Sequence, residues 1–279
     1  MTERKRVVFT NEDFIKSGDV VNISSDIFTK EERIIKVRLS WRGRYDLDLS
    51  AIMLDENGRL HTDEIEDENG ISIVPRIDDV VCFRSTIRWK ANSEENILEG
   101  KIYQNLKEAI KDKVCKTKRE YSDEFYPVSI CGGVIGPRDE QGDENDDTTV
   151  VHEEELYLRI DKIDLCEYSS VAIIATISLL DVKDGAKFAD IASPKVEFFE
   201  PDNNDMEDKE IVPPYLLDRN NPDANIIPRR ECTGICLGFF KWDENGELSF
   251  EATERGYRQK FDENGGAIVP IATVANSFI

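Results

Sequence analysis

Histidine is the scarcest of the side chains that usually carry catalysis, because the 279-residue chain contains only His61 and His152. No GxSxG nucleophile elbow occurs, and the glycine-rich segment 132–136 (GGVIG) matches neither a P-loop nor a dinucleotide-binding fingerprint. The spacing of residues in the sequence identifies neither a Ser-His-Asp triad nor a Cys-His pair. Cys232 and Cys236 would form only half of a zinc site. We therefore expect a protein that is not an enzyme.

Long hydrophobic runs are also missing. No stretch approaches the roughly 18 to 20 apolar residues that a membrane span needs, and the longest, around 170–180, suits a buried strand. The basic cluster at Arg4, Lys5 and Arg6 is not followed by the apolar region of a signal peptide. We expect neither a membrane span nor a secretory signal.

Cysteine is too sparse for a disulfide scaffold. The chain has 6 cysteines scattered along its length, several of them inside apolar, strand-like runs where buried free thiols are common. This usage predicts a protein of the reducing cytoplasm.

Basic side chains are outnumbered: 36 Lys and Arg stand against 58 Asp and Glu, which gives a formal net charge of -22. A field of this sign repels nucleic-acid phosphate and anionic membranes and attracts cations. We expect proteins as partners and no nucleic acid. The basic stretch 111–119 fits either a docking patch or a solvated helix end whose cations suit the helix dipole, and we favour the helix end.

Alternation of apolar and polar residues is the dominant local pattern and predicts strands. Many short strands separated by turn signals indicate a mainly β protein, an antiparallel β-sandwich with one or more short helices. Apolar spacing from Ile102 to Val114 predicts one helix, for which Asn92 and Glu95 could form an early capping box. The expected strands are 33–41, 47–54, 80–84, 156–160, 171–180, 196–199, 235–240 and 248–253.

The tetrapeptide DENG occurs four times, beginning at Asp55, Asp67, Asp243 and Asp262. Each copy could place oxygens around a cation, but an Asn-Gly pair accepts the positive φ of a tight turn. We interpret all four as hairpin turns.

An acidic loop, GDENDDTTVVHEE, carries the sharpest local pattern. Asp143, Asn145 and Asp147 occupy positions 1, 3 and 5 of a calcium-loop spacing, and Glu154 occupies position 12. Thr148 stands where an EF-hand needs glycine, and the flanks are not helical. A calcium loop of another kind and an acidic, solvated hairpin loop both remain open.

A second acidic pattern is the Asp-Leu-Asp sequence at 46–48. In a strand, Asp46 and Asp48 lie on one face about 7 Å apart and repel each other unless a cation or donors lie between them. The alternative is an edge strand whose aspartates point outward and pair with Arg42 or Arg44. We favour the metal interpretation.

Together these motifs resemble domains of the TerD type, the tellurite-resistance and stress-response family. The resemblance covers roughly half of the chain, and the order of its segments is more specific than any one of them. It is carried by GDVVNIS and IKVRLSWRGRYDLDLSAIMLDENGRL, then GDENDDTTVVHEEELYLRIDKID, then SVAIIATISLLDVKDGAKFADIAS, and finally LGFFKWDENGELSFEATERGY.

The resemblance implies a β-sandwich that binds one or two calcium ions at one end and acts in stress responses through protein partners. Asp46 and Asp48 match the family's Asp-Leu-Asp aspartates. Two alignments of the family's acidic loop stay open, one placing Asp143, Asp146 and Asp147 in it and the other Glu153 and Glu154.

The chain also departs from the family. Where a Gly-Asp-Asn step opens the family's ligand loop, this chain has Gly133, Val134 and Ile135, which lack the oxygen donors and put one calcium site in doubt. We predict one domain over 1–279 with two insertions, a helical one at about 86–127 and a Pro-rich loop at about 202–232. An interaction scaffold with degraded metal sites is the alternative function.

Overall fold

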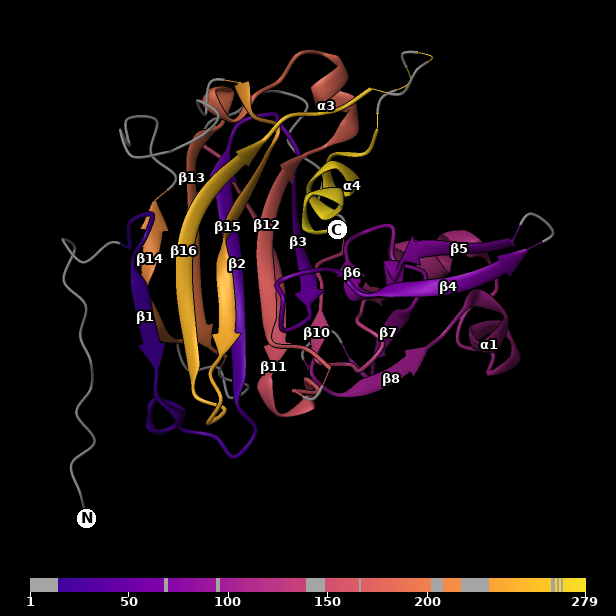
Figure 1. The fold of residues 1–279 in the computed structure, drawn as a ribbon, viewed down its shortest axis with the longest axis horizontal. Helices are drawn as coiled ribbons and strands as arrows, with labels where there is room; N and C mark the ends of the chain where they lie inside the picture. Colours follow the sequence, from indigo (N-terminus) through magenta and orange to yellow (C-terminus); the bar gives the residue numbers. More distant parts are fainter. Residues whose placement is uncertain are drawn as a thin grey trace.

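A computed structural model describes residues 15–67, 70–93, 96–138, 149–165, 167–201, 208–216, 231–261, 264, 266 and 268–279. Two antiparallel sheets face each other and enclose the main hydrophobic core (Figure 1). The prediction of a mainly β, antiparallel sandwich with a few short helices is confirmed.

The first sheet has six strands, and its central strands are covered on both faces. All eight residues of β3 and all eight of β12 are buried. In β3, Leu47, Leu49, Ala51 and Met53 face the second sheet, whereas Ile52 and Leu54 face outward into another apolar cluster. In order across the sheet the strands are β1 (Val20–Ile23), β16 (Leu248–Tyr257), β15 (Gly234–Trp242), β12 (Ser170–Ile177), β3 (Leu47–Leu54) and β6 (Val80–Val81).

The second sheet has five strands, with β2 at its centre. Its edge strand β14 includes Pro213 and Pro214, two residues of the segment that the sequence predicts to be a Pro-rich loop. An edge strand tolerates proline because one of its sides has no ladder to supply with N–H groups. The order is β10 (Val134–Ile135), β11 (Val151–Arg159), β2 (Ile34–Arg42), β13 (Ala192–Glu200) and β14 (Lys209–Leu216).

A third, smaller sheet packs on the outside of the five-stranded sheet. It consists of β8 (Gly100–Tyr103), β7 (Arg88–Ala91) and β9 (Tyr126–Pro127). Trp89 and Tyr126 of this sheet share an apolar cluster with Ile135 and Tyr157 of the sandwich.

Two helices lie between strands β8 and β9 of the third sheet, α1 (Leu106–Lys111) and α2 (Lys118–Asp123). The predicted capping box is wrong, since the side chain of Asn105 caps α1 by accepting the Glu108 N–H at 3.1 Å. The predicted helix also began too early, because Ile102 lies in β8. The region predicted as a helical insertion is therefore part sheet and part helix.

The outward face of the six-stranded sheet is covered by α4 (Pro270–Ala275), which carries Ile271 and Val274 into the cluster of Ile52 and Leu54 (Figure 1). None of the helices in the described part of the chain has the length and apolar content that a membrane crossing requires. The described residues also form α3 (Leu179–Lys183) and the 3-10 turns Ser25–Ile27, Ile77–Asp79, Ile160–Lys162, Phe188–Asp190 and Asn276–Phe278.

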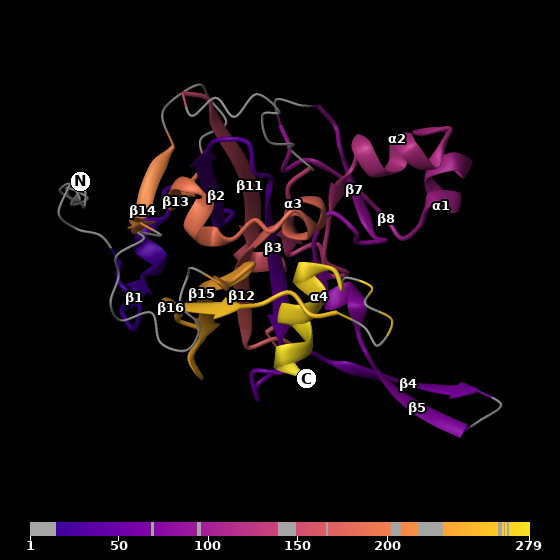
Figure 2. The same ribbon diagram turned by 90° about the horizontal axis from the view of Figure 1, so that it is seen from above.

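A two-stranded hairpin, β4 (Thr62–Asp67) and β5 (Gly70–Pro75), projects from the body in both views (Figures 1 and 2). We call it the arm. Strand pairing confirms a hairpin turn for the DENG copy at Asp243. In the copy at Asp67, the paired residues Asp67 and Gly70 flank two residues that lie outside the described part of the chain. The copy at Asp55 is a tight turn with Gly58 at φ 69, but it joins β3 to the arm rather than to a paired strand, so that prediction is wrong. Three residues of the fourth copy lie outside the described residues.

Candidate functional site

The end of the sandwich where β3 begins holds a buried carboxylate, Glu154 of β11. The residue is 2% exposed, and its Oε2 accepts the backbone N–H of Leu49 at 2.5 Å. Strand β6 pairs with β3 only at Ala51 and Ile52, so Glu154 occupies the open edge beside Leu49 in place of a neighbouring strand. Two acidic segments that lie far apart in the sequence thus meet one residue beyond Asp48.

Asp46 lies at the same end, just before β3. Its backbone N–H donates to Asp181 Oδ2 at 2.8 Å, and its carbonyl accepts the Ser178 N–H at 2.9 Å. Ser178 is the N-cap of α3, and Asp181 lies in the first turn of that helix, where a carboxylate is favoured by the helix dipole. These bonds fix the start of β3 against α3.

Asp48 lies on the other face of β3 from the sandwich interior. It shares the outward face with Ile52 and Leu54, and it is 7% exposed. Its charge acts on Cys82, whose thiol pKa is raised first by burial and further by Asp48. Glu154, in contrast, lies on the inward-facing side of β11 with Leu156. The structure therefore places Asp48 and Glu154 on different sides of β3.

Glu153 and Glu155 face outward from β11 and belong to a surface network of ion pairs. Arg38 lies 3.7 Å from Glu153 and 2.7 Å from Glu155, and Lys36 lies 3.2 Å from Glu155. Asp208 also pairs with both cations. Burial acts to raise the pKa of Glu155, but the hydrogen bond from Tyr157 and these cations outweigh it, so that pKa is lowered.

The described residues contain no group of three or more His, Cys, Asp or Glu side chains arranged to hold a metal ion. Calcium takes six to eight oxygen ligands, so the carboxylates at the start of β3 supply only part of a site. Val134 and Ile135 are fully buried in β10 and offer no side-chain oxygen. Asp143, Asp146 and Asp147 lie outside the described residues, and their role as ligands stays a prediction.

A cluster that sequence reasoning missed lies at the root of the arm. Asp79 is fully buried and accepts two hydrogen bonds, from Tyr168 Oη at 2.6 Å and from His61 Nδ1 at 3.0 Å. The rings of His61 and Tyr168 pack edge to face at 5.1 Å. Burial raises the pKa of Asp79, although both hydrogen bonds act in the opposite direction. No spacing rule links these residues, which lie 18 and 89 positions from Asp79.

His61 and Tyr168 line a surface hollow of about 560 Å³ with Asp55, Glu167 and Ser169. The Ser169 hydroxyl donates to the backbone oxygen of Asp55 at 2.6 Å. Arg76, which follows the arm, pairs with Glu167 and lies 3.3 Å from Asp63. The cluster therefore fastens both ends of the arm to the turn that precedes β12.

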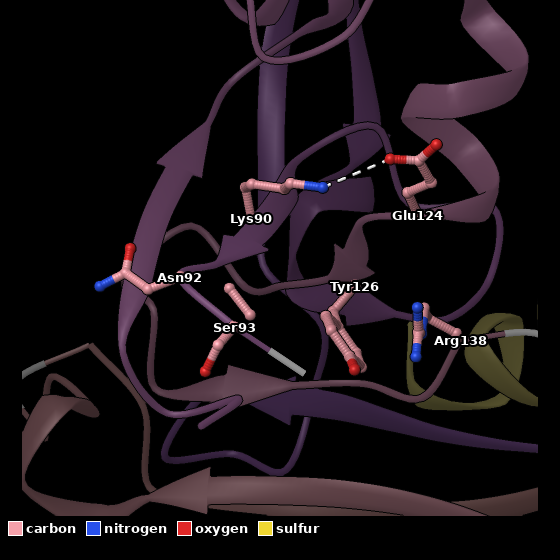
Figure 3. A pocket seen from close by; sticks show the side chains of 7 residues that line it. Lys90, Asn92, Ser93, Glu124, Tyr126 and Arg138 are labelled. Carbon is pink, nitrogen blue, oxygen red and sulfur yellow. Dashed lines mark hydrogen bonds and ion pairs between the residues drawn. The ribbon is translucent and has the colours of Figure 1, made fainter. Parts of the chain in front are cut away.

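A second hollow, of about 290 Å³, opens between β7 and the start of the segment after β10 (Figure 3). Lys90 and Glu124 form an ion pair at 3.4 Å across it, and the guanidinium of Arg138 lies 4.9 Å from the centre of the Tyr126 ring. Tyr126 and Arg138 also line a neighbouring hollow of about 310 Å³, whose other wall includes residues 153–155. Both hollows are lined by acidic and basic side chains.

Comparison with known proteins gives a limited result. No protein-family model matches the chain, and no curated protein matches it in sequence. The solved structures that resemble it include two proteins. One is a protein of unknown function, SAV2460, with 16% identity, a TM-score of 0.40 and coverage of 82% of this chain and 91% of that one. The other is a homologue of the telluride resistance protein TerD, SCO6318 from Streptomyces coelicolor, with 14% identity, a TM-score of 0.43 and coverage of 85% and 99%. Likeness at this level assigns neither family nor function.

Proposed function

We propose that this chain is a non-enzymatic, calcium-binding protein of the cytoplasm that acts through protein partners in a stress response, as the resemblance of its motifs to TerD-type domains implies. Its net charge of -22 favours cation binding, and the described cysteines are free thiols, as suits a reducing compartment.

The observation that carries the calcium proposal is the meeting of acidic residues at the start of β3. The buried carboxylate of Glu154 binds the N–H of Leu49, and Asp181 binds the N–H of Asp46. Acidic residues from two distant segments thus contact the start of β3, where Asp46 and Asp48 add two more negative charges. Like charges that lie close together repel one another, and a divalent cation relieves such repulsion. Carboxylate and carbonyl oxygens are also the ligands that calcium prefers.

A second candidate function is an interaction scaffold whose metal sites are degraded. One observation favours it: Glu154 and Asp48 lie on different sides of β3, so they do not face one common ion. Under this proposal the carboxylates at the end of the sandwich serve the fold alone.

The deciding experiment is thermal unfolding of chelator-treated protein with calcium or magnesium added separately. A ligand at 100 times its dissociation constant stabilises the native state by about 2.7 kcal/mol, which corresponds to a rise in midpoint of about 5 °C or more. We expect calcium to produce this rise, and Asp46→Asn combined with Asp48→Asn to abolish it.

Glu244→Gln is the matched control, since it removes one exposed negative charge from the β15–β16 turn at the opposite end of the sandwich. It should leave the calcium effect unchanged. Absence of any shift in the parent protein at millimolar calcium would overturn the calcium proposal and leave the scaffold candidate in place.

A further inference from the structure

The arm is an unusual surface feature because it has no layer to pack against. Its two strands pair with each other over six positions, from Thr62 opposite Pro75 to Asp67 opposite Gly70. Six residues of strand extend about 20 Å. An isolated two-stranded hairpin is marginally stable in water and presents two open edges. We therefore expect another surface to cover the arm and stabilise it.

One face of the arm combines apolar and acidic side chains. Cross-strand neighbours share a face, so the pairs Glu64–Ile73 and Glu66–Ile71 lie together. Ile71 is 68% exposed and Ile73 is 70% exposed. Isolated exposed hydrophobic residues are ordinary, but two adjacent isoleucines on a projecting hairpin mark an interaction surface.

The charge of the arm restricts what can cover it. The sequence of its two strands and turn, TDEIEDENGISIVP, contains five acidic residues and no basic one. Pairing of one arm with the arm of a second copy would place these carboxylates against each other, which is unfavourable. The covering surface must instead be basic and have an apolar centre.

The surface that fits best lies on α1, α2 and the loop between them, residues 105–124, which carry six Lys and Arg and five Asp and Glu. Two of these carboxylates are paired with cations outside the segment, Asp112 with Lys101 and Glu124 with Lys90, which leaves an excess of positive charge. Ile110 is 44% exposed, and it lies one helical turn from Lys107. We call this the basic patch; its exposed cations are Lys107, Lys111, Lys113, Lys116, Lys118 and Arg119. Among the described residues only Arg119 of these forms an ion pair, with Asp123 at 3.1 Å. The arm and the two helices point in different directions, so the arm does not cover the patch of its own chain (Figure 2).

We propose that the arm of one copy docks on the basic patch of a second copy. Ile71 and Ile73 would pack against Ile110, and Glu64 and Glu66 would face the unpaired lysines. A two-fold axis would let each copy give its arm and receive its partner's, which closes a dimer with two equal contacts. Because the chain is acidic overall, most of its surface repels a second copy. Contact between the acidic arm and the basic patch is therefore favoured over other arrangements of two copies. The inference rests only on the protein-contact part of the proposed function, not on calcium.

The test is the mass of the full chain in solution, measured by light scattering and sedimentation with calcium absent. We expect a dimer at micromolar concentration in low salt, with a dissociation constant that rises at least tenfold in 0.5 M salt, because partly exposed ion pairs are screened. Glu64→Lys combined with Glu66→Lys should weaken the dimer by tenfold or more.

A complementary variant makes the experiment specific. Lys107→Glu and Lys118→Glu lie in the first turns of α1 and α2, where an acidic residue suits the helix dipole, so the helices should persist. This pair should also weaken the dimer, and an equimolar mixture of the arm variant with the patch variant should form a heterodimer. In one of its contacts the unchanged arm meets the unchanged patch, and in the other the reversed charges of the two variants meet. A chain carrying all four changes should form a dimer again.

A monomer at 100 μM in low salt overturns the proposal, as does a dimer that the arm variant leaves intact. Both outcomes are independent of the calcium melting experiment, so failure of one proposal is distinguishable from failure of the other. Circular dichroism of each variant checks that a lower mass in solution reflects dissociation of the dimer and not unfolding.

Discussion

Strands β3 and β4 follow each other in the sequence, joined by a segment that begins with a DENG turn, yet their surroundings are opposite. Every residue of β3 is buried, whereas Ile65 of β4 is 50% exposed and its neighbours are exposed too. The difference arises from neighbours: β3 lies between β12 and β6 with α4 on its outer face, and β4 has only β5. Burial of a strand thus depends on the elements that pack against it, and the two strands of the arm were not among those predicted from the sequence.

The largest expected effect on the free energy of unfolding comes from a substitution in the hydrophobic core of the sandwich, which has no counterpart in the arm. Phe198 is fully buried, with its ring 4.7 Å from Phe250 and 5.9 Å from Phe240. Phe198→Ala should lower the free energy of unfolding by about 3 to 5 kcal/mol through lost burial and the cavity left behind. Ile73→Ala in the arm should change it by less than about 0.5 kcal/mol in the monomer. Denaturant titration measures both, and equal losses would contradict the contrast between the two regions.

An intermediate effect is expected at the junction of the two regions, where Tyr168 holds Asp79 at the root of the arm. Tyr168→Phe removes the 2.6 Å donor to a fully buried carboxylate, at a cost of about 1 to 3 kcal/mol. Hydrogen exchange of the arm should accelerate more than exchange of β12, because the clamp acts locally. Tyr45→Phe removes a hydroxyl that bonds exposed Arg44 and serves as control. Uniform acceleration across the sandwich would contradict a local clamp.

The smallest effect concerns acid stability of the five-stranded sheet. The pKa of Glu155 is lowered in the folded state, so its contribution is complete above its ordinary value of 4.5 and is lost as pH falls through the folded value. Glu155→Gln should therefore flatten the fall in unfolding free energy below pH 4.5 while costing stability at neutral pH. Parallel pH profiles for parent and variant would show that Lys36 and Arg38 do not stabilise the carboxylate.

Sequence periodicity predicted the sandwich because its signal is local. β3, β13, β15 and β16 cover the strand predictions made for them, and β2 begins one residue later than predicted. Alternation along each strand reports which face is buried. The edge strand β14 escaped prediction since Pro213 and Pro214 normally indicate a loop. The early start of the predicted helix arose because Ile102 fits the apolar spacing of a helix while its backbone pairs with β7.

The candidate site was less predictable. Asp46 and Glu154 were both named from the sequence, and the structure places them at the same end of the sandwich. That Asp48 lies on the other side of β3 depends on which face of the strand the second sheet covers, and a sequence does not carry that information. The cluster of His61, Asp79 and Tyr168 corresponds to no recognisable spacing pattern in the sequence.

The sequence by itself determined the alternation of its strands, the position of its turns and an acidic charge whose field repels phosphate groups. These properties depend on composition and on neighbours within a few residues. Only the tertiary structure decided that Glu154 meets the backbone of β3, that Asp79 is buried between two donors, and that the arm is left uncovered. Those outcomes depend on contacts between distant segments, where packing of the sheets selects one partner among many.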